Sequence, residues 1–133
     1  MRPPFLKGEF KMSCNCNCLN EDNTIKFVAG TSCDLSFDFD EDISSYTSAE
    51  FVIRANYAAS PVINKTLTGL SGTTLEVNLT PSDTAQFTEF QNGKNSATYI
   101  WGLDLIDSAQ DIRINVFPQT GEPAPLCIVY KHV

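Results

Sequence analysis

From Thr24 onward, apolar and polar residues alternate along the chain with a period of two. Between residues 34 and 40, for example, Leu35, Phe37 and Phe39 are separated by aspartate or serine. Successive side chains of a β-strand point to opposite faces, so this alternation predicts strands with one buried and one exposed face. The period favours an all-β fold.

The same alternation recurs in several later segments, separated by turn signals such as Ser71-Gly72, Asn92-Gly93 and Thr120-Gly121. Two shorter segments, 24–28 and 61–68, are further strand candidates. Short strands at this spacing predict an immunoglobulin-like antiparallel β-sandwich of about seven or eight strands. The residues expected to face its core are Phe51, Ile53, Ala55, Leu75, Val77, Leu79, Tyr99, Trp101, Leu103, Leu105, Ile112, Ile114, Val116, Leu126, Ile128 and Tyr130.

One segment breaks the strand period. The sequence TPSDTAQF places Thr80 as an N-cap, Pro81 at the first helical position and Asp83 three residues after the cap. This arrangement resembles a capping box and predicts one short helical turn between strands, with Ala85 and either Phe87 or Phe90 packed inward.

The first 23 residues carry no such period. We therefore predict two parts: an N-terminal extension or docking arm over residues 1–23, and the sandwich over residues 24–133.

Composition excludes several classes of partner. The 133 residues carry a formal net charge of −7 with only nine lysines and arginines, and nucleic-acid binding needs basic patches. No stretch approaches the roughly 20 apolar residues of a membrane span. The N-terminus also lacks an apolar run typical of a signal peptide. We expect neither nucleic-acid nor membrane binding, and synthesis in the cytoplasm.

Catalytic signatures are missing. The one histidine, His132, is the penultimate residue, and no glycine-rich phosphate loop, GxSxG or HExxH motif occurs. The acidic run at 38–42 is best explained as a solvated strand face and turn. The run does not match an EF-hand calcium-binding loop, because Ile43 and Ala49 occupy the positions that need glycine and glutamate. We expect a protein that is not an enzyme and needs no cofactor.

The sequence CNCNC places Cys14, Cys16 and Cys18 at alternate positions. In an extended segment these thiols would share one face, spaced about 6.5 Å apart. Zinc sites usually combine wider pairs, C-x₂₋₄-C, with a second pair. An odd total of five cysteines, with no export signal, also argues against a disulfide framework. Three alternatives remain: a reduced, passive arm, a metal shared between subunits through Cys14, Cys16 and Cys18, or intermolecular disulfides.

Three aromatic residues bear on an exposed binding surface. Trp101 shares its phase with Tyr99 and Leu103, which places it in the core rather than on a sugar-stacking platform. Phe117 has the opposite phase to Val116 and is a candidate for an exposed patch, as is Tyr57 just beyond its strand. By the same argument, Cys127 is out of phase with the core residues predicted in its segment.

Three stretches of the sequence together resemble a known family. FVAGTSCDLSFDFDEDISSYTSAEFVIRA resembles the opening of the immunoglobulin-like N-terminal domain of phage baseplate upper proteins and related phage fibre proteins. LEVNLTPSDTAQF resembles the strand and Thr-rich helical turn of that family, and YIWGLDLID its aromatic strand before a hairpin. The resemblance covers roughly residues 24–117 and rests on the pattern of these stretches.

The resemblance implies a non-enzymatic virion structural protein, with no catalytic residues to carry over. Its partners would be other virion proteins in a baseplate, tail, head-fibre or capsid-decoration assembly, in which the chain is a homo-oligomer or part of a larger complex. Sheet edges and an arm that orders on contact suit such a role. The alternative is a bacterial surface adhesin or a carbohydrate-binding immunoglobulin-like module.

Overall fold

A computed structural model describes residues 18–90, 93–118 and 121–133 of the chain. The described part is an all-β sandwich with one short helix, as predicted. Its elements are β1 (Ile25–Val28), β2 (Cys33–Asp38), β3 (Ser48–Arg54), β4 (Ile63–Thr68), β5 (Thr74–Leu79), α1 (Pro81–Thr84), β6 (Ser96–Asp107), β7 (Ile112–Phe117) and β8 (Leu126–Tyr130).

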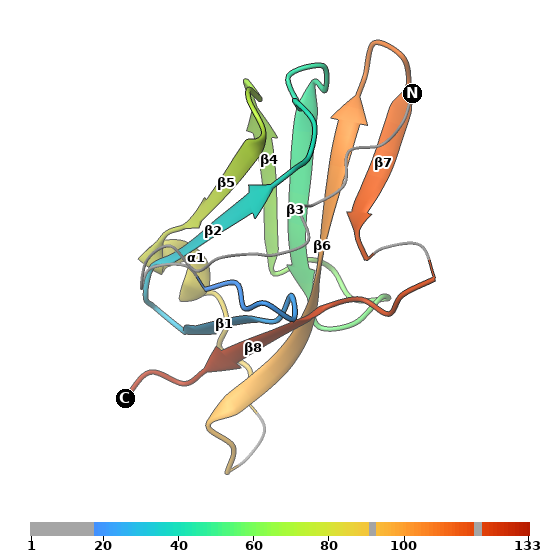
Figure 1. Ribbon diagram of the computed structural model, residues 1–133. Coiled ribbons are helices and arrows are strands. Elements are labelled where there is room, and N and C mark those ends of the chain that lie inside the picture. Colours follow the sequence, from blue (N-terminus) through green and yellow to red (C-terminus); the bar gives the residue numbers. More distant parts are fainter. Residues whose placement is uncertain (1–17, 91–92, 119–120) are drawn as a thin grey trace.

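The strands form a large sheet and a small one (Figure 1). The large sheet has the order β1-β8-β6-β3-β4, and β7 also pairs with β6. The twelve-residue strand β6 pairs with both β8 and β7, because its first half lies beside β8 and its second half beside β7. Only the β1–β8 pair is parallel among the described pairings. The small sheet is the antiparallel pair β2–β5.

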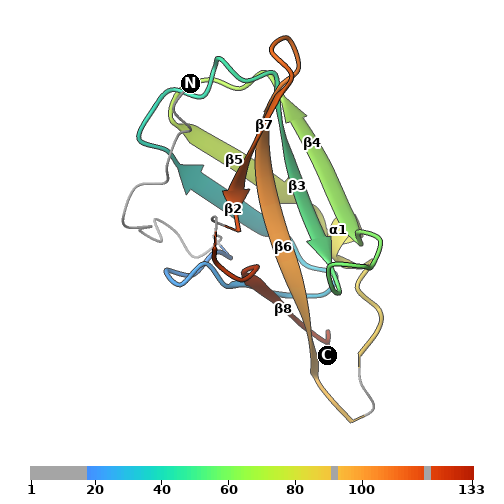
Figure 2. The ribbon, with the colours of Figure 1, turned by 90° about the vertical axis from the view of Figure 1, so that its right-hand side faces the viewer.

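The two sheets form the layers of the sandwich. In Figure 2, strands β3, β4, β6 and β7 face the viewer and the β2–β5 pair lies behind them. An aromatic cluster fills the space between the layers: the Trp101 ring lies 4.8 Å from the Phe117 ring, 5.7 Å from Phe37 and 5.8 Å from Phe51, centroid to centroid. The prediction that Trp101 is a core residue is confirmed, since it is 2% exposed.

The predicted phase of β8 is wrong. Cys127 and Val129 are fully buried, whereas Leu126 and Tyr130 are exposed. In the large sheet, Cys127 lies opposite both Ile25 of β1 and Tyr99 of β6, which face the core. Directly opposed residues share a face, so pairing with two neighbours sets the phase of β8. The segment contains apolar residues on both faces, and alternation alone could not separate them.

The predicted exposure of Phe117 is also wrong, because Phe117 is only 3% exposed. The register between β6 and β7 shifts at Leu103 and Asp104: Leu103 lies opposite Phe117, whereas Asp104 lies opposite Asn115. This irregularity inserts one extra residue on β7, as a β-bulge does. Val116 and Phe117 are consequently both buried, although they are adjacent in sequence.

Two further predicted core positions are exposed in the structure. Ala55 lies beyond the end of β3 and is exposed. Ala85 is exposed as well, because α1 is a single turn and its buried residue is Thr84. The Thr84 hydroxyl donates a hydrogen bond to the carbonyl of Thr31, at 2.6 Å. Phe87 is buried after the helix, as predicted, and its ring lies 4.9 Å from that of Tyr99.

The predicted capping box is present at the start of α1. The Thr80 hydroxyl accepts from the Asp83 amide at 3.1 Å, and the Asp83 carboxylate accepts from the Thr80 amide at 2.9 Å. The same carboxylate oxygen lies 2.8 Å from the Lys65 ammonium of β4. These bonds with Lys65 and the cap hold the pKa of Asp83 below its usual range. The helix cap thereby connects β5 to the edge strand of the large sheet.

We expect Thr80→Ala to lower the free energy of unfolding by about 1 kcal/mol, since it removes the cap bond to the Asp83 amide. Urea unfolding of the purified chain measures this change. Ser82→Ala is the matched control, because Ser82 is exposed within the same turn. Equal stability of the two variants would show that the cap does not stabilise the sandwich.

Residues 18–23, which the sequence assigned to the arm, contact the sandwich. Leu19 is fully buried and forms a bridge with Ile25. The Cys18 amide donates to the Asp34 carbonyl, and the Cys18 carbonyl accepts from the Lys26 amide, both at 3.1 Å. The remainder of the predicted arm lies outside the described residues. Within the described part of the chain, no helix is long and apolar enough to cross a membrane.

Candidate binding pocket on the outer face of the large sheet

The outer face of the large sheet carries a pocket of about 140 Å³. Strands β3, β6 and β7 supply its floor, and the β3–β4 and β7–β8 connections supply its rim. The lining residues are Glu50, Val52, Arg54, Tyr57, Ile100, Trp101, Gly102, Leu103, Asp104, Asn115, Phe117, Pro118 and Ala124.

Gly102 creates the hollow. It lies in the middle of β6, opposite Val52 of β3, at a position whose side chain would point outward. A Cβ atom there would lie 3.1 Å from the Phe117 carbonyl oxygen, closer than ordinary van der Waals contact. The β-bulge brings the β7 backbone to this position, so glycine suits the close approach. Any larger residue would also fill the pocket.

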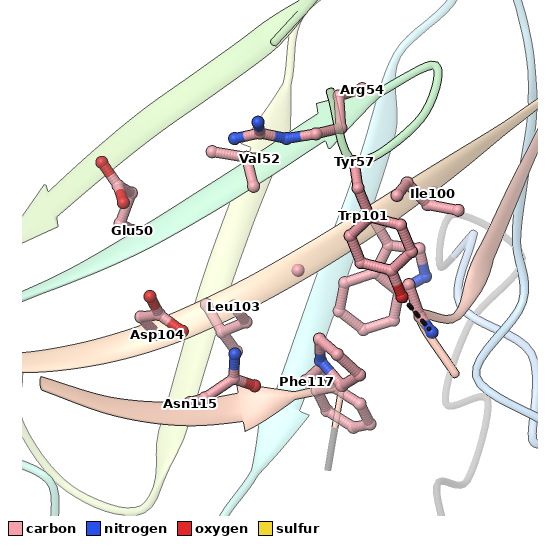
Figure 3. A pocket seen from close by; sticks show the side chains of 13 residues that line it. Glu50, Val52, Arg54, Tyr57, Ile100, Trp101, Leu103, Asp104, Asn115 and Phe117 are labelled. Atoms are coloured by element: carbon pink, nitrogen blue, oxygen red, sulfur yellow. Dashed lines mark hydrogen bonds between the residues drawn. The ribbon is translucent and has the colours of Figure 1, made fainter. Parts of the chain in front are cut away.

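Tyr57 forms one wall of the pocket and is 70% exposed. Its hydroxyl oxygen accepts a hydrogen bond from the Ala124 amide at 3.1 Å, drawn as a dashed line in Figure 3. This bond ties the loop after β3 to the segment before β8 and restrains the ring without burying it. The prediction of an exposed aromatic residue thus holds for Tyr57.

The two ends of the pocket differ in charge. Glu50 and Asp104 lie at one end, and both accept from Arg113 Nη1, at 2.9 and 2.6 Å. The bonds to Asp104 and Glu50 raise the pKa of the Arg113 guanidinium. Arg54 lies at the other end and donates to the Ala59 carbonyl at 3.2 Å. Figure 3 shows Arg54, Tyr57 and Asn115 around the pocket, each from a different element.

The lining of this pocket combines aromatic, apolar and charged side chains. None of the described residues that line the pocket is a serine, threonine, cysteine, histidine or lysine. Its two carboxylates, Glu50 and Asp104, are engaged by the same arginine. The pocket offers an exposed aromatic ring, apolar walls and a few polar groups, which is the usual composition of a recognition site.

The acidic run 38–42 has structural roles in this fold. Asp38 accepts a hydrogen bond from the Thr74 hydroxyl at 2.8 Å, and Asp42 accepts from the Ser44 amide at 2.7 Å. The Ser44 hydroxyl and that amide hold the pKa of Asp42 below its usual range. His132 is exposed near the end of the chain, away from the pocket residues.

The cysteines are brought together only in part. Cys14 and Cys16 lie outside the described residues, whereas Cys18 is half-buried beside the fully buried Cys33. The hydrogen bond between these two thiols lowers the pKa of Cys18 and, together with burial, raises that of Cys33. Burial also raises the pKa of Cys127 above its usual range. Across residues 18–90, 93–118 and 121–133, no cluster of three or more histidine, cysteine or carboxylate groups is arranged to hold a metal.

Fold and pocket together define an all-β sandwich with a pocket on one exposed sheet face. In comparisons with protein-family models, curated proteins and solved structures, nothing matches this chain.

Proposed function

We propose that this chain is a non-enzymatic, immunoglobulin-like structural subunit of a bacteriophage virion. It acts through protein–protein contacts with other virion proteins in a baseplate, tail, head-fibre or capsid-decoration assembly. Two arguments support this role: the resemblance of residues 24–117 to phage baseplate and fibre domains, and the recognition pocket of the large sheet.

The observation that carries the proposal is the placement of Tyr57. Tyrosine and arginine are enriched among the few residues that carry most of the binding energy of protein interfaces, and these residues cluster in well-packed pockets. Tyr57 and Arg54 flank such a pocket, and the bond from the Ala124 amide restrains the tyrosine before any partner arrives. A restrained anchor loses less conformational entropy on binding.

The large sheet would therefore dock a partner at this pocket. The acidic end, formed by Glu50 and Asp104, favours a neighbouring basic group on the partner, since two carboxylates share one guanidinium. A partner loop that inserts one apolar side chain beside Tyr57 and places a lysine or arginine near Glu50 would match both features.

We expect Tyr57→Ala to weaken docking about 30-fold, which corresponds to a hot-spot loss of about 2 kcal/mol. The measurement is rebinding of purified chain to particles of the phage that carries the gene, prepared with the gene deleted. Tyr130→Ala is the matched control, because Tyr130 is also partly exposed but lies on β8 and outside the pocket.

The proposal has two ways to fail in this experiment. Mass spectrometry of wild-type particles that detects no copy of the chain would exclude a virion role. Rebinding that is equal for the Tyr57 and Tyr130 variants would exclude the pocket as the docking site.

The same pocket supports a second candidate function, that of a carbohydrate-binding module. An exposed tyrosine ring beside Arg54, Asn115 and Glu50 offers a sugar both a stacking surface and planar hydrogen-bonding groups. Titration with simple pyranoses and their oligomers, followed by amide chemical shifts, tests this candidate. Shifts confined to the pocket and lost in Tyr57→Ala would favour it over the protein-docking role.

A further inference from the structure

The outer edge of β5 has backbone groups that pair with no strand in the part of the chain that the structure describes. In the β2–β5 ladder, the Asp34 carbonyl points away from β5, because it accepts from the Cys18 amide, whereas the Phe39 amide donates to Thr73 on the β5 side. Backbone groups of successive residues point to opposite sides of a strand, and those of every second residue point to the same side. Thr74, Glu76 and Asn78, which lie opposite Asp38, Ser36 and Asp34, therefore direct their amides and carbonyls away from β2.

These edge groups have no backbone partner among the described residues. The Thr80 amide, two residues beyond Asn78, also points away from β2, but it already donates to the Asp83 carboxylate. The open part of the edge thus runs from Thr74 to Asn78, close to the length of an average strand.

The neighbouring edge of the large sheet is protected against such pairing. Lys65 of β4 lies opposite the buried Phe51, so its side chain starts on the inner face, where it reaches Asp83 at 2.8 Å. An inward-pointing charge on an edge strand disfavours the addition of another strand. The β5 edge has no such charge between Thr74 and Asn78 on its inner face, where Leu75 and Val77 are buried.

A groove of about 290 Å³ runs beside the open edge. Its lining includes Ile43, Leu67, Leu70 and Leu75 together with Thr74 and Glu76 of the edge itself. Leu67 and Leu70 are half-buried against the core. The side chains of an added strand that point toward the large sheet would enter this groove, whose mixed lining includes the leucines Leu67 and Leu70.

The opposite, solvent-facing side of the small sheet is acidic. Cross-strand pairing places Asp34, Ser36 and Asp38 of β2 beside Asn78, Glu76 and Thr74 of β5. The Thr74 hydroxyl donates to Asp38, which confirms that the two side chains share this face. Three carboxylates and no basic residue are present among these six positions. Side chains of an added strand on this side would meet negative charge.

We propose that the Thr74–Asn78 edge of β5 binds an extended segment of a partner protein in which lysine or arginine alternates with apolar residues. The backbone of the segment adds a strand to the small sheet. Its apolar side chains enter the Leu67–Leu70 groove, and its basic side chains face Glu76 and the aspartates of β2. Main-chain bonds of this type supply affinity, and alternate side chains supply specificity. The inference does not depend on the pocket at Tyr57.

The first test is fluorescence anisotropy with a labelled peptide of about nine residues that alternates lysine with valine. We expect binding that is lost when every lysine is replaced by glutamate. Two further peptides carry N-methyl groups on alternate amides, one on every lysine amide and the other on every valine amide. Only one of them should lose binding, because only one set of amides faces β5. Equal loss in both methylated peptides, or equal binding of the glutamate peptide, would overturn the proposal.

Variants of the chain locate the site. Glu76→Lys should weaken the lysine peptide about tenfold, whereas Glu122→Lys, the same charge change at an exposed loop, should not. Glu76→Pro removes an edge amide that the β2 ladder does not use, and it should abolish binding. Should the proline variant fail to fold, Glu76→Lys still decides the outcome. Equal weakening by Glu76→Lys and Glu122→Lys would reduce the interaction to general electrostatics and overturn the proposal.

Tyr57→Ala separates this inference from the proposed function. The variant should bind the lysine peptide as the wild type does, because Tyr57 lies on the opposite face of the large sheet from the β2–β5 pair. Reduced peptide binding in Tyr57→Ala would place the peptide at the pocket and contradict strand addition at β5.

Discussion

Replacement of Trp101 by alanine is expected to lower the free energy of unfolding by about 4 kcal/mol, in the range typical of buried tryptophan truncation. Trp101 is 2% exposed and lies among the rings of Phe37, Phe51 and Phe117. Truncation would leave a cavity between the two sheets. Chemical denaturation monitored by circular dichroism measures the loss, since the variant removes the chain's one tryptophan.

The Trp101→Phe variant separates packing from hydrogen bonding. The indole Nε1 donates to the Asn23 carbonyl at 3.0 Å, which fastens the loop before β1 to β6. Phenylalanine keeps much of the ring contact but loses this bond. We therefore expect Trp101→Phe to lower the free energy of unfolding by less than Trp101→Ala does, with about 1 kcal/mol of its effect due to the missing bond. A loss as large for phenylalanine as for alanine would show that the bond to Asn23, rather than ring packing, dominates.

Oxidation of the Cys18–Cys33 pair is expected to raise the free energy of unfolding by about 3 kcal/mol, the value for a disulfide that closes a loop of about 15 residues. The two thiols are hydrogen-bonded, and the same contact lowers the pKa of Cys18. Glutathione disulfide is the oxidant: Cys18 thiolate attacks it and releases one glutathione. Cys33 then loses its proton, its sulfur attacks the Cys18 sulfur of the mixed disulfide, and the second glutathione leaves as a thiolate that takes up a proton.

Peptide mapping and unfolding of the oxidised chain measure this prediction. A Cys14→Ser, Cys16→Ser background removes the other N-terminal thiols, and a further Cys18→Ser change is the control. We expect a Cys18–Cys33 linked peptide and increased stability in the background protein, and neither in the control. A linkage to Cys127 instead, or a linked peptide without added stability, would contradict the prediction.

The candidate site was only partly visible in the sequence. Tyr57 stood out as an aromatic residue just beyond a strand, but Arg54 and Asn115 looked like ordinary exposed strand residues. Gly102 carried no distinct signal, because glycine within an alternating strand predicts only a local irregularity. Its role follows from the close approach of the Phe117 carbonyl, which depends on the register between β6 and β7.

The open edge of β5 could not be predicted from the sequence either. Alternation of Leu75, Val77 and Leu79 correctly placed their side chains in the core. It said nothing about which neighbours the strand has, because backbone hydrogen bonds run within the sheet, perpendicular to the side chains. That β5 pairs with β2 alone among the described strands is a property of the assembled layers.

By itself, the sequence determined the features that depend on neighbouring residues. The period of two defined the strands and the buried faces of β2, β5 and β6, and Thr80, Pro81 and Asp83 defined the helix start. These are local preferences of backbone and side chain. Only the tertiary structure decided the phase of β8, the burial of Phe117 and the contact between Cys18 and Cys33. Each of these depends on which distant strand lies alongside and in what register, and such pairings are set by packing across the whole sandwich.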